Sequence, residues 1–153
     1  MNVQYINPFI EAFDNFFKEK LKTVVKQGEL GVSKGEINVR EFAAIVGYGG
    51  AVQGIISMIF PVKTALGIAS AIERTQVVVV DETVTDHLGN IVHAVARDAK
   101  GKFPGGENIQ QTQFAVMRGS EFMEKYPGGV WLEVPFDTDF GDLRLRVALK
   151  AGG

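Results

Sequence analysis

The stretch DETVTDHLGNIVHAVARDAK, residues 81–100, predicts one long helix with two unlike faces. Its apolar residues recur at steps of three and four and form one stripe: Val84, Leu88, Ile91, Val92, Val95 and Ala99. A polar set recurs at the same steps about half a turn away, and we call it the polar row: Asp86, Asn90, His93 and Arg97. Such a helix buries its apolar stripe. The polar row is then either an ordinary solvated face or a reactive edge.

Outward from this helix, the patterns run in the order helix, three strands, helix, helix, three strands. Asn7 as N-cap and Pro8 at the first helical position predict a helix start, and its apolar period continues to about residue 26. A second helix is predicted from Pro61 to residue 72. The predicted strands cover residues 29–32, 40–46, 52–60, 109–117, 130–136 and 143–149. The four valines at 77–80 predict a strand or an extended lead-in to the long helix.

Turn residues join these strands into two hairpins. Residues 47–50, Gly-Tyr-Gly-Gly, predict the first turn, and residues 137–142 predict the second. Gly54, inside a strand, predicts a bulge or a close backbone approach. Residues 118–126 are polar and irregular. The pattern favours an α+β fold: two helix-plus-three-strand halves, a mostly antiparallel sheet with helices packed on one face, and weak internal two-fold symmetry.

Composition limits the class of protein. The chain of 153 residues suits one domain, residues 1–153, that buries its own core. It has no cysteine, and its net charge of −2 with dispersed basic residues argues against nucleic-acid binding. The start MNVQYINPF shows no signal peptide, and the apolar runs are too short to span a membrane. We therefore expect a soluble, cytoplasmic protein.

The common catalytic signatures are missing: the nucleophile elbow, the Walker phosphate loop, HExxH, and a GxGxxG that opens a helix. The two histidines are six residues apart and lie on different helix faces, so we expect no metal site. The acidic residues Asp137, Asp139 and Asp142 suit a turn better than a calcium loop.

Two features distinguish the polar row from a plain solvated face. It uses Asn and His, where an exposed helix face more often carries Lys and Glu. Gly89 also lies in mid-helix, at a cost of about 1 kcal/mol relative to Ala, and lets another group approach closely. A smaller polar pair, Glu11 and Asn15, shares one face of the first helix, where a structural role is favoured.

Four segments resemble the CheX branch of the CheC/CheX/FliY family of bacterial chemotaxis phosphatases. They are YINPFIEAFDN (5–15), VGYGGAVQGIISMIFPVKTALGIA (46–69), TDHLGNIVHAVARDAK (85–100) and VPFDTDFGDLRLRVAL (134–149), in matching order over nearly the whole chain. The resemblance implies a fold of two helix-plus-strands halves and a homodimer. It also implies a partner, the receiver domain of a CheY-type response regulator, and removal of phosphate from the receiver's aspartyl-phosphate.

The family motif is Glu-x-x-Asn on a long helix. By the resemblance, the Asn orients water beside the phosphoryl group and the Glu holds a receiver Lys, while the receiver supplies the metal ion and this chain needs no cofactor of its own. This sequence departs from the motif: Asn90 stands at the Glu position and His93 at the Asn position. Asp86, Gly89 and Arg97 would then be flanking partner contacts.

The departure leaves three readings. His93 and Asn90 keep catalysis with changed roles; or catalysis is lost and the chain is a non-catalytic dimeric binder of the phosphorylated receiver; or the Glu11 and Asn15 side acts instead, which is the least favoured. A polar row kept for docking should be exposed and beside a shallow groove, whereas a drifted row should be buried or blocked. The sequence identifies neither the particular receiver nor the dimer surface.

Overall fold

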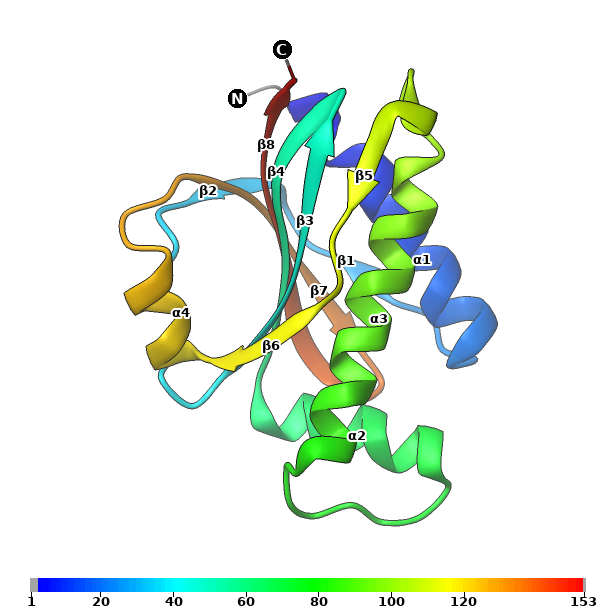
Figure 1. Ribbon diagram of the computed structural model, residues 1–153. Helices are drawn as coiled ribbons and strands as arrows, with labels where there is room; N and C mark the ends of the chain where they lie inside the picture. Colours follow the sequence, from blue (N-terminus) through cyan, green and yellow to red (C-terminus); the bar gives the residue numbers. More distant parts are fainter. Residues whose placement is uncertain (1–2, 153) are drawn as a thin grey trace.

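The computed structural model describes residues 3–152. Its helices are α1 (Asn7–Lys20), α2 (Val62–Glu73), α3 (Glu82–Lys100) and α4 (Gly119–Lys125), with 3₁₀ turns at Val3–Tyr5 and Gly106–Asn108. Its strands are β1 (Lys26–Gln27), β2 (Gly31–Ser33), β3 (Phe42–Gly50), β4 (Val52–Phe60), β5 (Ile109–Gln111), β6 (Ala115–Arg118), β7 (Trp131–Thr138) and β8 (Gly141–Ala151). All strands join one sheet around which the helices are arranged (Figure 1).

The sheet is antiparallel and internally symmetric. Its eight strands follow the order β1-β7-β8-β4-β3-β5, with β2 also on β7 and β6 also on β3. The central pair is β4 with β8, and each half lends its short strands to the other half's hairpin. Exchanging β1–β4 with β5–β8 therefore reproduces the same order read backwards. The predicted α+β class and two-fold symmetry are confirmed.

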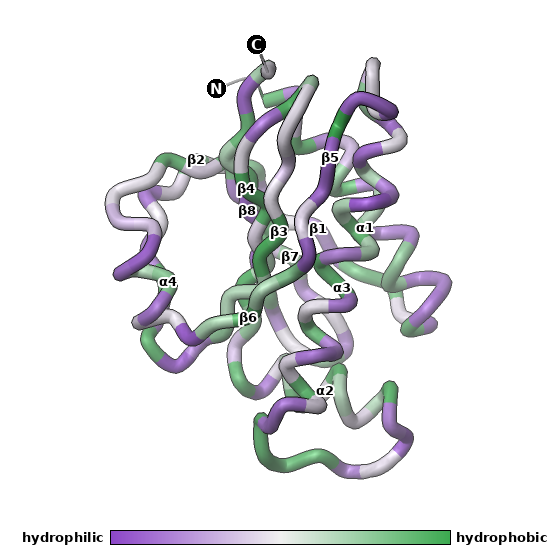
Figure 2. The backbone as a smooth tube through the Cα atoms, in the orientation of Figure 1, coloured by the Kyte–Doolittle hydropathy of each residue, from purple (hydrophilic) through white to green (hydrophobic). Residues whose placement is uncertain are grey.

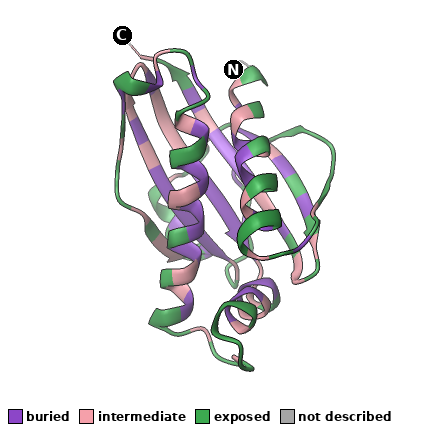
Figure 3. Ribbon diagram, turned by 90° about the vertical axis from the view of Figure 1, so that its right-hand side faces the viewer, coloured by how far each residue is buried: buried purple, intermediate pink, exposed green. Residues whose placement is uncertain are grey.

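The two long helices, α1 and α3, lie side by side on one face of the sheet, as predicted (Figures 1 and 3). Aromatic rings of α1 fill the space beneath it: Phe13 stacks on Phe136 of β7, with ring centroids 4.0 Å apart, and on Phe17 at 4.4 Å. All three rings are buried. Burying a side chain of this size stabilises the fold by roughly 1.5–3 kcal/mol, so this layer fixes α1 firmly.

The opposite face of the sheet carries a smaller core under α4, a helix that the sequence pattern did not predict. Phe122 of α4 packs on Trp131 with ring centroids 5.6 Å apart, and Ile37, Ala43 and Ile45 lie in the same cluster. The segment 118–126 was predicted as irregular because its polar residues dominate. This helix depends on Phe122 packing against residues that are distant in the sequence, such as Trp131 and Ile37.

The first helix and first hairpin differ in detail from their predictions. Asn7 is not the N-cap: Ile6 precedes the helix without a side-chain cap, and α1 ends at Lys20 rather than near residue 26. The expected turn residues 47–50 belong to β3, and the chain reverses at Gly50, whose φ is +95°. Gly54 has a φ of +139°, and a side chain there would collide with Ala148, so its predicted close backbone approach is confirmed.

The valines at 77–80 form an irregular lead-in to α3, with a bend at Val79, and not a strand. The Val77 N–H donates to Ser70 Oγ at 2.9 Å, which ties the segment to α2. Val78 and Val79 are exposed, and Figure 2 shows this connection as a hydrophobic stretch of the tube. Within residues 3–152, none of the helices is long and apolar enough to cross a membrane.

Candidate functional site

The site is built on α3, and its ends explain why the helix forms where it does. Asp81 is extended and its carboxylate accepts a hydrogen bond from the Val84 N–H at 3.1 Å, a standard N-cap. Glu82 lies in the first turn and Arg97 and Lys100 in the last, where their charges complement the helix dipole. The predicted apolar stripe is buried throughout.

A buried tyrosine ties α3 to the sheet. Tyr48 of β3 donates its hydroxyl hydrogen bond to the backbone carbonyl of Ala96. Burial raises the pKa of the Tyr48 phenol well above its ordinary value. The neutral phenol, through this hydrogen bond, fixes the position of the second half of α3 relative to β3.

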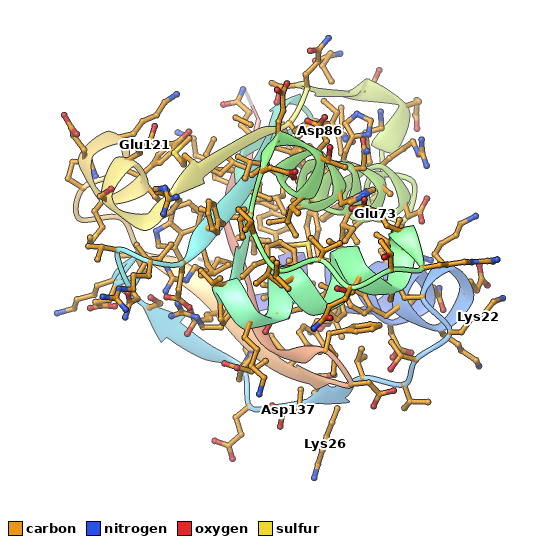
Figure 4. The ribbon with its side chains drawn as sticks, turned by 90° about the horizontal axis from the view of Figure 1, so that it is seen from below. Lys22, Lys26, Glu73, Asp86, Glu121 and Asp137 are labelled. Atoms are coloured by element: carbon orange, nitrogen blue, oxygen red, sulfur yellow. The ribbon has the colours of Figure 1, made fainter. Side chains whose placement is uncertain are left out.

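The polar row faces away from the sheet and is open to solvent. Asp86, Asn90 and Arg97 are exposed, and His93 is half-buried. Asp86 lies on α3 away from α2, whereas Glu73 ends α2 close to α3, where its carboxylate lies 3.3 Å from His87 (Figure 4). Asn90 and His93 are three positions apart in the sequence, so they are about 4.5 Å apart along the helix axis and lie on the same side of the helix.

Gly89 has no side chain and so leaves room on α3 for an aromatic ring from another segment. The Phe114 ring lies against Gly89, and a Cβ at that glycine would be only 2.6 Å from Phe114 Cγ. Gly89 itself is buried by this contact. The prediction that this glycine admits a close neighbour is thereby confirmed, and the neighbour is Phe114.

A shallow pocket of about 280 Å³ opens beside the polar row, lined by Asn90, His93, Gln113 and Phe114. Gln111 supports it from below, since its Nε2 donates to the backbone carbonyl of His93 at 3.0 Å. The row is therefore exposed and next to a groove, the arrangement expected of a docking surface.

Sequence reasoning missed Gln113 and Phe114 as lining residues. It predicted one strand over residues 109–117, whereas β5 and β6 are separated by residues 112–114. The available signal was the polar run Gln-Gln-Thr-Gln at 110–113, which does not suit a strand packed against a helix. Only the pairing of both pieces with β3 brings Gln113 to the helix.

The site is made of an amide and an imidazole between two charged side chains. An amide can donate and accept, and an imidazole can exchange a proton near neutral pH. Asp86 lies before the pair on the helix and Arg97 after it. Across the described residues 3–152, no cluster of three or more His, Asp or Glu side chains could hold a metal ion.

The polar pair on α1 lies apart from this pocket. Glu11 is exposed and forms an ion pair with Lys102 at 3.1 Å, and Asn15 is exposed. In the second hairpin, Asp139 accepts a hydrogen bond from Thr23 Oγ1 at 2.6 Å, which is a structural use of a turn carboxylate.

Comparison with solved structures identifies the fold. The chain is similar to the chemotaxis protein CheX of Vibrio vulnificus, at a TM-score of 0.80 and 22% identity over 97% of this chain and 100% of that one. It is equally similar to CheX in the CheX–CheY–BeF₃–Mg²⁺ complex of Borrelia burgdorferi, at 0.80 and 22% over 97% and 99%. A CheC-like superfamily protein of a Shewanella species matches at 0.78 and 20% over 99% and 100%.

These likenesses define the class: the chain has the fold shared by CheX and CheC-like chemotaxis proteins. The resemblance seen in the sequence is confirmed at the level of the fold. No protein-family model matches the sequence, and no curated protein matches it.

Proposed function

We propose that this protein docks through α3 onto a phosphorylated CheY-type receiver domain and hydrolyses the receiver's aspartyl-phosphate. The observation that carries the proposal is the open pocket in which Asn90 and His93 stand one helical turn apart. The likeness to a CheX solved in a complex with CheY supports a partner of this type.

In the proposed reaction, α3 positions one water molecule in line with the acyl-phosphate bond. The water oxygen bonds to phosphorus while the P–O bond to the receiver's aspartate breaks, and its electron pair leaves with the carboxylate. The water's proton passes to the His93 imidazole, and inorganic phosphate is the second product. Phosphoryl transfer needs positioning and charge stabilisation above all, which amide and imidazole groups can supply.

Asn90 has a docking role in this scheme. Its amide would hydrogen-bond the receiver's active-site region, and the receiver would bring its own metal ion. Asp86, Gly89 and Arg97 would flank the contact. We further propose that the protein is cytoplasmic and works as a homodimer, in keeping with the resemblance described above.

The alternative is a non-catalytic binder of the phosphorylated receiver. It is favoured by the identity of the two residues, since Asn90 and His93 replace the Glu and Asn of the family motif. Losing one well-placed polar group costs on the order of 10²–10³ in rate, so a double change is able to abolish catalysis while the docking surface persists.

The test is phosphate loss from a phosphorylated CheY-type receiver of the same organism, with the parent protein, His93→Ala and His87→Ala. His87 is the matched control: it lies on the same helix, pairs with Glu73, and is outside the pocket. We expect acceleration by the parent, a loss of about 10²-fold or more in His93→Ala, and parental activity in His87→Ala.

Binding separates the two functions. Absence of acceleration by the parent, with saturable binding to the receiver in BeF₃ and Mg²⁺, would reject the enzyme and establish the binder. Absence of both activity and binding would reject docking through α3 altogether.

A further inference from the structure

We infer that Gln113 is a third polar residue of the reaction site, whose side-chain amide contacts the phosphoryl group and the attacking water. The inference rests on the proposed function and adds a residue from outside α3. Four observations carry it: a bulge in the sheet, two clamps on the backbone, a free amide, and a shared pocket.

The bulge places Gln113 outside the regular ladder. Along β3, the pairing advances three residues from Tyr48 to Ile45, while the facing chain advances four, from Gln111 to Ala115. The facing chain therefore carries one extra residue. Bulges of this kind redirect side chains and are over-represented beside active sites.

The backbone on each side of Gln113 is held in place. On one side, the Thr112 N–H donates to the Gly47 carbonyl at 3.0 Å, and the Gly47 N–H donates to Thr112 Oγ1 at 2.9 Å. The Thr112 hydroxyl in turn donates to the Gln113 carbonyl at 2.9 Å. On the other side, the Phe114 ring rests on Gly89 of α3. Gln113 thus projects from a fixed base.

The side-chain amide of Gln113 is exposed and unengaged, since no hydrogen bond joins it to any other residue in the described range 3–152. The contrast with Gln111 is informative, because Gln111 Nε2 is used to hold the His93 carbonyl. Of the two glutamines, one supports the site and the other is available to a ligand.

The pocket joins this amide to the helix. Gln113 and Phe114 line the same cavity as Asn90 and His93. An amide can donate to a phosphoryl oxygen and accept from water at once, and being neutral it does not repel the anion. A glutamine amide that orients the attacking water is a known device of phosphoryl-group hydrolysis. Phe114 forms the apolar wall of the pocket beside these groups.

The experiment measures kcat and KM for the phosphorylated receiver with the parent, Gln113→Ala, Gln113→Glu and Gln110→Ala. Gln110 is the matched control, an exposed glutamine on β5 that does not line the pocket. We expect Gln113→Ala to lower kcat by about 10²-fold with KM changed less than about twofold. Gln113→Glu should lose at least as much, because it removes the N–H donor and adds a negative charge. Gln110→Ala should match the parent.

Each contrary result has a distinct meaning. A Gln113→Ala protein as active as the parent, while His93→Ala is inactive, would overturn the role of Gln113 and leave the proposed function standing. A change in KM alone would reduce Gln113 to a docking contact and overturn its role in the reaction. An equal loss in Gln110→Ala would reveal a structural effect of the segment. An inactive parent would reject both the role and the catalytic function.

Discussion

The contact between Gly89 and Phe114 can be tested by adding one methyl group. In Gly89→Ala, the new Cβ would lie 2.6 Å from Phe114 Cγ and closer to two further ring atoms. Carbon atoms in contact normally lie about 3.5–4.0 Å apart, so the ring must move by at least about 1 Å. Phe114 is half-buried, and it can yield only by leaving the surface that it covers on α3.

Two opposing effects set the size of the change. Replacing glycine by alanine inside a helix stabilises it by about 1 kcal/mol, whereas overpacking a filled site costs about 1–3 kcal/mol. With a cost near the middle of that range, Gly89→Ala should lower the free energy of unfolding by about 1 kcal/mol. In a Phe114→Ala background the collision is gone, and the same substitution should raise it by about 1 kcal/mol. The coupling between the two sites is then about 2 kcal/mol.

Urea unfolding of the four proteins of this double-mutant cycle measures the coupling, and circular dichroism checks that each folds. The change of sign between the two backgrounds is the decisive observation. If Gly89→Ala stabilises the parent by about 1 kcal/mol, as on any open helix face, then Phe114 does not rest on Gly89 and the pocket loses its apolar wall.

Two further predictions concern stability. Arg146 is fully buried and donates from Nε to Glu133 at 2.6 Å, and Glu133 also lies 3.6 Å from Arg144. Arg146→Met should therefore lower the free energy of unfolding by roughly 2 kcal/mol through the lost charge-assisted hydrogen bond, and Arg146→Met with Glu133→Gln should recover part of the loss in urea unfolding. The pKa of Tyr48 is raised in the folded state, so the contribution of this group to the free energy of unfolding is complete below the ordinary phenol pKa and is lost as the pH rises beyond it. The free energy of unfolding should therefore fall less steeply between pH 9 and 12 in Tyr48→Phe than in the parent.

The parts of the fold that could be predicted are those encoded locally. The long helix begins directly after its N-cap Asp81 and buries its stripe as expected, because capping and period lie within 20 neighbouring residues. The Thr138–Gly141 hairpin pairing follows from its turn residues in the same way. The polar row is likewise exposed on α3, as its period indicated, whereas its role in chemistry stays a prediction.

The parts that could not be predicted depend on partners far along the chain. The bulge before β6 exists only against β3, more than sixty residues earlier, and it brings Gln113 and Phe114 to the pocket. The helix α4 depends on Phe122 meeting Trp131 and Ile37 across the sheet. Periodicity in one segment carries no information about such pairings.

The internal two-fold symmetry relates this pocket to a differently lined one of about 360 Å³ in the first half, bordered by residues that include Ile10, Glu11, Asp14 and Gln27. Gln27 and Gly31 pair with β7 through the same one-residue bulge that Gln111 and Ala115 form with β3. When α1 is aligned with α3 by their buried positions, Ile10 corresponds to Gly89. When the two bulges are aligned by their strand pairing, Leu30 corresponds to Phe114.

In the first half the helix fills the position with its own isoleucine, and Leu30 remains 41% exposed. In the second half the helix offers a glycine, and the bulge supplies the ring that covers it. The lining of the pocket beside α3 thus differs by one exchange between symmetric positions: side-chain volume removed from α3 is returned by Phe114, which carries Gln113 beside the polar row. The same backbone arrangement, present in both halves of the sheet, thereby carries two differently lined surfaces.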